Sequence, residues 1–164
     1  DFSDIIEPNE NGHSFVENAM IKARYYYDFF KIATIADDSG LEVEALNNEP
    51  GIYSARYASN DDKNSTDQEN RNKLLYKMKN VEKRNAHFCC AIAYYDGRLM
   101  KYSVANTFGK ILGKEIGNNG FGYDSVFFSD DLGKPLGLAS DEEKDLISHR
   151  GKALRQLLND MKKD

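Results

Sequence analysis

Two adjacent carboxylates, Asp37 and Asp38, are the side chains of this sequence that are best placed to do chemistry. They follow a β-rich run over residues 32–36 and precede Ser39-Gly40, a pair that predicts a turn before a second β-like run over 41–46. Ligand sites of α/β proteins lie where strands give way to loops, and paired acids there can hold a divalent cation and polarise a water molecule. Asp, Ser and Gly are also common turn residues, so a solvated turn explains the same pattern.

A glycine-rich segment, GNNGFGYD over residues 117–124, is the second candidate for chemistry. Glycines allow a ligand to approach the backbone closely, and an aromatic ring gives a flat base a surface on which to stack. A hairpin turn with buried aromatic side chains fits the same residues.

A basic cluster near the end of this acidic chain is the third candidate. Lys144, His149, Arg150 and Lys152 lie within a few residues of the start of a predicted helix, where such donors suit an anion. Ordinary charges that flank a helix are the alternative explanation.

Apolar side chains at helical and strand spacing predict the elements that must position these residues. Ser14 and Glu17 form the S-x-x-E pattern of a capping box, which alone would account for Glu17. The sequence predicts helices over residues 14–30, from 65 or 66 to about 79, over 140–146 and from 151 to about 162, and a hairpin of strands 86–95 and 99–107 joined by Asp96-Gly97.

Composition limits the class of protein. At 164 residues with 40% hydrophobic content, we expect a single domain over residues 1–164 with a sizeable core. The formal net charge of -5 argues against a nucleic-acid partner, which normally requires a basic face. No apolar run approaches the roughly 20 residues of a membrane span, so we expect no membrane partner.

The two cysteines, Cys89 and Cys90, are neighbours in an apolar run. Adjacent residues of a strand point to opposite faces, so we expect these thiols to pack in the core and not to form a disulfide. Unpaired thiols fit a reducing, cytoplasmic setting.

Taken together, five blocks of this sequence resemble the Ham1 family, which comprises the inosine triphosphate and xanthosine triphosphate pyrophosphatases. The resemblance extends from Ser14 to about Leu158, with the blocks in the right order. The blocks are Ser14-Phe15-x-Glu17-Asn18-Ala19 with Lys22-Ala23, then Ala36-Asp37-Asp38-Ser39-Gly40-Leu41-Glu42-Val43, Pro50-Gly51-Ile52-Tyr53-Ser54-Ala55-Arg56-Tyr57, Phe121-Gly122-Tyr123-Asp124 and Ser148-His149-Arg150-Gly151.

The resemblance implies a mixed α/β fold, with a long curved central sheet and flanking helices that form two lobes around a nucleotide-binding cleft. It also implies a homodimer that requires magnesium (Mg²⁺). The implied reaction is hydrolysis of non-canonical purine nucleoside triphosphates (ITP, dITP and XTP) to the monophosphate and pyrophosphate, which cleanses the nucleotide pool.

By matching position, the resemblance also implies a role for each site residue. Asp38 is expected to be the general base and a metal ligand, with Glu17 as its partner on the cation and Ser39 as a substrate contact beside the base. The other expected substrate-binding residues are Phe121, Gly122, Tyr123 and Asp124, which would hold the base and sugar, and Lys144, His149 and Arg150, which would grip the base edge and the phosphates.

The sequence departs from the family at its start. The family opens with a strand and a Thr-Asn-x-x-Lys phosphate loop, and no such motif precedes Ser14. We therefore expect that the N-terminal strand and loop are absent from this chain. Two alternatives to the enzyme follow: a nucleotide-binding homologue whose turnover is impaired by the missing loop, and a purely structural dimeric protein.

Overall fold

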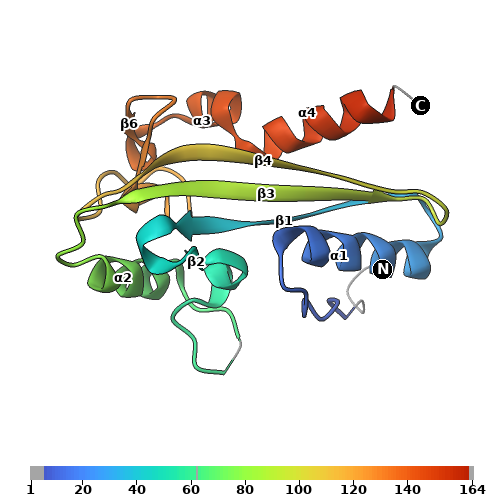
Figure 1. Cartoon of the computed structure of the whole chain (residues 1–164), viewed down its shortest axis with the longest axis horizontal. Coiled ribbons are helices and arrows are strands. Elements are labelled where there is room, and N and C mark those ends of the chain that lie inside the picture. Colours follow the sequence, from blue (N-terminus) through green and yellow to red (C-terminus); the bar gives the residue numbers. More distant parts are fainter. Residues whose placement is uncertain (1–5, 62, 163–164) are drawn as a thin grey trace.

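The computed structural model describes residues 6–61 and 63–162, and its centre is a six-stranded sheet with the strand order β2-β1-β3-β4-β5-β6. Each neighbouring pair in this order is antiparallel, and the long strands β1, β3 and β4 run the length of the molecule (Figure 1). The strands are β1 (Thr34–Val43), β2 (Glu49–Pro50), β3 (Asn85–Tyr95), β4 (Met100–Ile111), β5 (Phe127–Ser129) and β6 (Lys134–Pro135).

Helices cover both faces of this sheet. Figure 1 shows α1 and α2 on one side of the long strands and α3 and α4 on the other. The expected α/β fold with a long sheet and flanking helices is therefore confirmed. The helices are α1 (Phe15–Phe30), α2 (Asp67–Lys77), α3 (Asp141–Ile147) and α4 (His149–Met161), with short 3-10 turns η1 (Glu44–Leu46), η2 (Gly51–Arg56), η3 (Asp124–Val126) and η4 (Leu136–Leu138).

The alternation of side chains along β3 joins the two helical layers to the sheet. Cys89 faces α1, where it packs with Phe15 and Ala19, whereas Cys90 faces α4, where it packs with Ala153 and Leu157. Both cysteines are buried free thiols, and burial raises the pKa of Cys89 to about 12 and that of Cys90 to about 11. The expectation of two packed thiols on opposite faces is confirmed.

The turn predicted at Ser39-Gly40 is wrong, because β1 continues through it. The main chain of residues 34–43 pairs with β3 at every position, so the ladder to a distant strand overrides the local turn preference. Gly40 serves a close approach instead: a Cβ at this position would lie 2.6 Å from the carbonyl oxygen of Gly51 and 2.4 Å from Oγ of Ser54. The second strand predicted over residues 41–46 is the end of β1, which stops at Val43, and η1 begins at Glu44.

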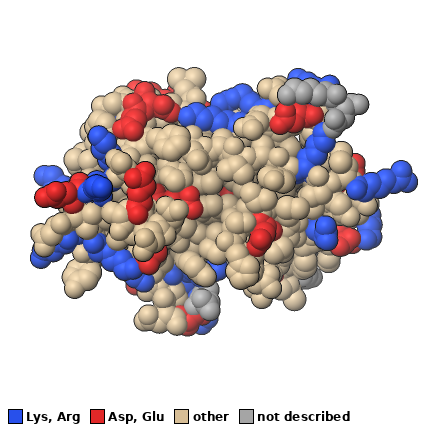
Figure 2. Space-filling view, in the orientation of Figure 1, with Lys and Arg blue, Asp and Glu red and all other residues tan. Residues whose placement is uncertain are grey.

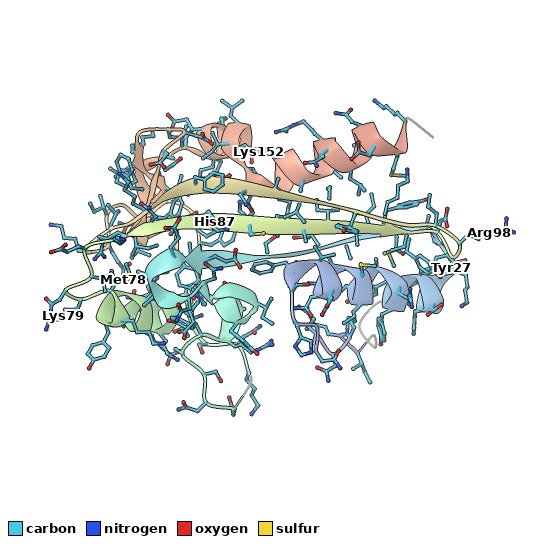
Figure 3. The ribbon with its side chains drawn as sticks, in the orientation of Figure 1. Tyr27, Met78, Lys79, His87, Arg98 and Lys152 are labelled. Carbon is cyan, nitrogen blue, oxygen red and sulfur yellow. The ribbon has the colours of Figure 1, made fainter. Side chains whose placement is uncertain are left out.

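Short-range sequence patterns, such as helix caps and the hairpin turn, correctly predicted most of the remaining helices and strands. Ser14, Thr66 and Ser140 cap α1, α2 and α3, as the sequence predicts, whereas α4 begins at His149, two residues before the predicted start. The β3–β4 hairpin is confirmed, and Figure 3 shows Tyr27 of α1 beside its tip, where Arg98 projects.

Two further features describe the exterior. On the face drawn in Figure 2, acidic and basic side chains are interspersed, mainly around the margin of the view. Within residues 6–61 and 63–162, none of the helices combines the length and the apolar character needed to cross a bilayer.

Candidate active site

A pocket of about 430 Å³ opens where β1, the 117–124 loop and the α3–α4 junction meet. Its floor includes Phe88 of β3 and Thr107 of β4, and Ser54 of η2 closes one side. All of the predicted substrate-binding residues line this single pocket: Ser39, Phe121, Gly122, Tyr123, Asp124, Lys144, His149 and Arg150. The structure thus brings together residues that the sequence separates by more than a hundred positions.

The adjacent acids of β1 project to opposite faces of the sheet. Asp38 faces α1, where its Oδ2 accepts a hydrogen bond from Nδ2 of Asn18 at 3.0 Å and its Oδ1 lies 3.2 Å from Nζ of Lys22. Asp37 faces α4, where it contacts Arg150. The first interpretation of the sequence, in which Asp37 and Asp38 share one cation, is therefore wrong for this strand geometry.

The acid that the structure does bring to Asp38 is Glu10, because both carboxylates contact the same ammonium group. Nζ of Lys22 lies 3.2 Å from Oε1 of Glu10 and 3.2 Å from Oδ1 of Asp38. The side chains of Lys22 and Asp38 are largely buried, so this arrangement is less screened than a surface ion pair. Sequence reasoning missed Glu10 because it lies in a polar segment without helical or strand periodicity.

Glu17 occupies a different place, at the first turn of α1. Its Oε2 accepts a hydrogen bond from the amide of His13 at 2.6 Å, and its own amide donates to Oγ of Ser14 at 3.2 Å. These bonds satisfy backbone donors at the helix start, as a capping residue does. The role of Glu17 as a metal ligand stays a prediction.

His149 forms part of the pocket wall by stacking on Phe88. The two rings are nearly parallel, at 13°, with centroids 5.4 Å apart, and Phe88 also contacts Phe127 at 4.7 Å. Burial, assisted by the positive charge of Arg150, lowers the pKa of His149 to about 4. The imidazole is therefore neutral near pH 7, so one ring nitrogen is able to donate a hydrogen bond and the other is able to accept one.

Lys144 and Asp124 form the opposite polar wall. Nζ of Lys144 lies 3.7 Å from Oδ2 of Asp124 and 3.2 Å from Oδ1 of Asp141. Burial raises the pKa of Asp124, while the Phe121 amide and Lys144 favour its charged form. Phe121 lines the pocket with 77% of the residue exposed, so its ring is open to stacking by a planar group.

The arrangement suits a nucleotide. A flat aromatic ring, a neutral imidazole and a buried acid can recognise a base by stacking and edge hydrogen bonds. Lys144 and Arg150 supply the positive charge that phosphates require. Ser39 lines the pocket, whereas the predicted base Asp38, its immediate chain neighbour, is not among the lining residues, because adjacent strand residues point to opposite faces and Asp38 contacts Lys22 of α1.

Comparisons with known proteins agree with this assignment. The profile of the Ham1 family matches residues 1–160. A relative from Aquifex aeolicus, named dITP/XTP pyrophosphatase, is 41% identical over 163 residues, which cover 96% of this chain and 81% of the relative. The solved structure of the Staphylococcus aureus Ham1 protein superposes with a TM-score of 0.89 at 40% identity, covering 96% of this chain and 81% of that one. A Ham1 protein from Coxiella burnetii gives the same TM-score at 35% identity, with 98% and 82% covered.

The fold and the pocket thus define an α/β protein with a nucleotide-type site. The chain belongs to the Ham1 family, and the resemblance drawn from the sequence is confirmed.

Proposed function

We propose that this chain is a nucleoside triphosphate pyrophosphatase, which hydrolyses the non-canonical purine nucleotides ITP, dITP and XTP to the monophosphate and pyrophosphate. Support comes from relatives that are named dITP/XTP pyrophosphatase and from the gathering of all the predicted substrate residues around one pocket. That gathering is the observation that carries the proposal, because it links an aromatic base surface to a cationic phosphate end.

Base selection rests on the wall opposite Lys144 and on the rim. Phe121 stacks on the purine, while the neutral His149 and the Arg150 guanidinium offer donors to the 6-keto oxygen of inosine or xanthosine. An adenine amino group at that position would leave a buried donor without an acceptor. Such a mismatch costs about 1–3 kcal/mol, or roughly 5- to 150-fold in kcat/KM.

The donor set beside Asp38 fits a magnesium ion. The ammonium of Lys22 already lies between two carboxylates there, so the spot stabilises positive charge, and carboxylate oxygens are the protein ligands that Mg²⁺ prefers. Among the described residues, no group of three or more acidic, His or Cys side chains is arranged to hold a metal. Two carboxylates leave coordination sites for water and substrate phosphate, which matches the habit of Mg²⁺.

Asp38 and Glu10 would hold this ion, with Glu17 as the alternative second acid. When bound, Mg²⁺ would neutralise the charge that develops on the attacked phosphate. Asp38 accepts the proton of the attacking water at a carboxylate oxygen, as a general base. Lys22 and Asn18 hold that carboxylate in position, because each donates to one of its two oxygens.

A nucleotide panel tests the proposal. The purified chain should release pyrophosphate and the monophosphate from ITP, dITP and XTP in the presence of magnesium, and far less from ATP. Equal kcat/KM values for ATP and ITP, or release of orthophosphate in place of pyrophosphate, would refute it. The homodimer implied by the resemblance stays a prediction, which sedimentation can check.

A further inference from the structure

The exposed ring of Phe121 has little packing to hold it, so its orientation must come from its backbone. With 77% of the residue exposed, neighbouring side chains do not fix the ring. The amide of Phe121 donates to Oδ2 of Asp124 at 3.3 Å, and its carbonyl accepts from the amide of Asp124 at 3.1 Å. These bonds fix the loop within itself, but they do not fix it relative to the rest of the pocket.

Helix α2 supplies the external anchor, through both polar groups of Gly122. Oδ2 of Asp67 accepts a hydrogen bond from the Gly122 amide at 2.6 Å, and Nη1 of Arg71 donates one to the Gly122 carbonyl at 2.7 Å. Residues four apart lie on the same face of a helix, so Asp67 and Arg71 grip one residue from one side. The peptide plane that joins Phe121 to Gly122 contains the amide held by Asp67, so this bond also fixes the carbonyl of Phe121.

A second set of contacts fixes the Arg71 guanidinium itself. Its Nε donates to Oε2 of Glu115 at 3.0 Å, and its Nη2 donates to Oε1 of Gln68 at 3.1 Å. Glu115 also accepts from Gln68 at 2.6 Å and from Ser125 at 3.0 Å, so it joins α2 to both ends of the 117–124 loop. These contacts hold the Arg71 guanidinium in the orientation in which its Nη1 meets the Gly122 carbonyl.

Gly122 is a flexible position, so the hydrogen bonds from Asp67 and Arg71 are needed to fix its backbone. Its φ is +57°, in the left-handed region, and a Cβ there would meet nothing within 4 Å. Glycine leaves several backbone conformations open at such a site, and no side chain restricts the choice. Without the contacts from α2, rotation at Gly122 would move the Phe121 ring relative to the Asp124–Lys144 wall.

We propose that Asp67 and Arg71 are positioning residues for base selection, which act by holding Gly122 and thereby the stacking face of Phe121. The proposal rests on the proposed function of the pocket. It assigns α2 to the base end of the substrate only, because the Asp38–Lys22–Glu10 cluster lies on other elements, α1 and β1, and on the segment before α1. Substitutions on α2 should therefore weaken base recognition and leave phosphate recognition intact.

Two pairs of variants test this. Asp67→Ala removes the acceptor for the Gly122 amide, whereas Asp67→Asn keeps an oxygen that can accept from it. Arg71→Met removes the donor, and Tyr76→Ala, at an exposed position of the same helix, is the matched control. The probes are inosine monophosphate, which presents the base, and inorganic tripolyphosphate, which does not.

Asp67→Ala and Arg71→Met should each weaken inosine monophosphate binding about tenfold, the size expected when a strong hydrogen bond to the loop is lost. Inhibition by tripolyphosphate should stay within a factor of two, and the ratio of kcat/KM for ITP over ATP should fall, mainly through KM for ITP. Asp67→Asn should recover most of the affinity. Equal weakening by the Asn and Ala variants, or parallel loss of tripolyphosphate binding, would overturn the inference.

A double-mutant cycle separates positioning from general stabilisation of the fold. If Arg71 acts through the ring, Arg71→Met should have almost no further effect on inosine monophosphate binding in a Phe121→Ala background. Additive losses would overturn the inference. Failure of the proposed function would look different, because the unmodified chain would then neither bind inosine monophosphate nor release pyrophosphate from ITP.

Discussion

Arg150 places two of its nitrogens, Nε and Nη2, each 2.9 Å from a single oxygen of Asp37. The pair joins the first turn of α4 to the middle of β1, and Oγ of Ser39 donates to the same oxygen at 3.1 Å. Asp37 therefore orients a guanidinium that lines the pocket, while its chain neighbour Asp38 faces the other side of the sheet. Because Asp37 and Asp38 have different partners, substitution of each acid should change a different kinetic constant.

For Asp37→Asn, we expect KM for ITP to rise several-fold with little change in kcat, because Arg150 loses the charge that orients it. An effect of about 1 kcal/mol, or roughly fivefold, is typical for weakening one such contact. Asp131→Asn is the matched control, because it weakens the 2.9 Å pair with Lys152, which lies on the same helix as Arg150 (Figure 3). Neither Asp131 nor Lys152 lines the pocket. A fall in KM would mean that Asp37 competes with substrate for Arg150.

For Asp38→Asn, we expect kcat to fall about 10²- to 10⁴-fold with the fold intact, because the amide keeps the shape but neither accepts the proton nor carries the charge. Steady-state kinetics and a thermal melt on the same sample check this. Asp37→Asn is the neighbouring control. Turnover close to that of the unmodified chain in a folded Asp38→Asn variant would refute the assignment of the base.

Local signals in the sequence were sufficient to predict the helices and the central hairpin. Caps such as Thr66 and Ser140 act within one turn of a helix, and the Asp96-Gly97 turn acts within one hairpin, so both are visible in a short window. The turn predicted at Ser39-Gly40 failed because pairing with β3, some fifty residues later, decided the backbone there.

The site residues divide in the same way. The sequence blocks identified the side chains that line the pocket, because each block is a recognisable local pattern. The partners of those side chains could not be predicted. Glu10 reaches Asp38 only through Lys22, and Asp67 meets Gly122 across 55 positions, so both contacts exist only after the chain has folded.

The close approach at Gly40 predicts a loss of stability in Gly40→Ala. The added Cβ would lie 2.6 Å from the Gly51 carbonyl oxygen, a backbone atom that cannot move without shifting η2. We expect the free energy of unfolding to fall by about 1–3 kcal/mol, as for other overpacked sites. Gly113→Ala is the control, since a Cβ there meets nothing within 4 Å. Equal melting temperatures for the two variants would contradict this reading of β1.

Glu10 and Glu17 predict opposite outcomes when each is changed to Gln. Glu10→Gln should raise the magnesium concentration needed for half-maximal activity about tenfold or more, because it removes one of two carboxylates near Lys22. Glu17→Gln should leave that concentration almost unchanged, because a Gln oxygen can still accept from the His13 amide. The reverse result would support Glu17 as the metal ligand that the family resemblance implies.

The lowered pKa of His149 predicts how stability depends on pH. Its pKa falls from 6.5 to about 4 on folding, so between these values the unfolded chain binds a proton that the folded chain does not. Stability from this group is therefore complete above pH 6.5 and is lost as the pH falls toward 4, at no more than about 1.4 kcal/mol per pH unit.

His149→Asn removes this titration, so the variant should lose less stability than the unmodified chain between pH 6.5 and 4. Urea unfolding at several pH values in that window measures the difference, and His13→Asn, at an exposed position, is the control. The variant should also be less stable at pH 7, because Asn has no ring to stack on Phe88. Parallel stability curves for the His149 variant and the unmodified chain would show that the imidazole is not held neutral in the pocket wall.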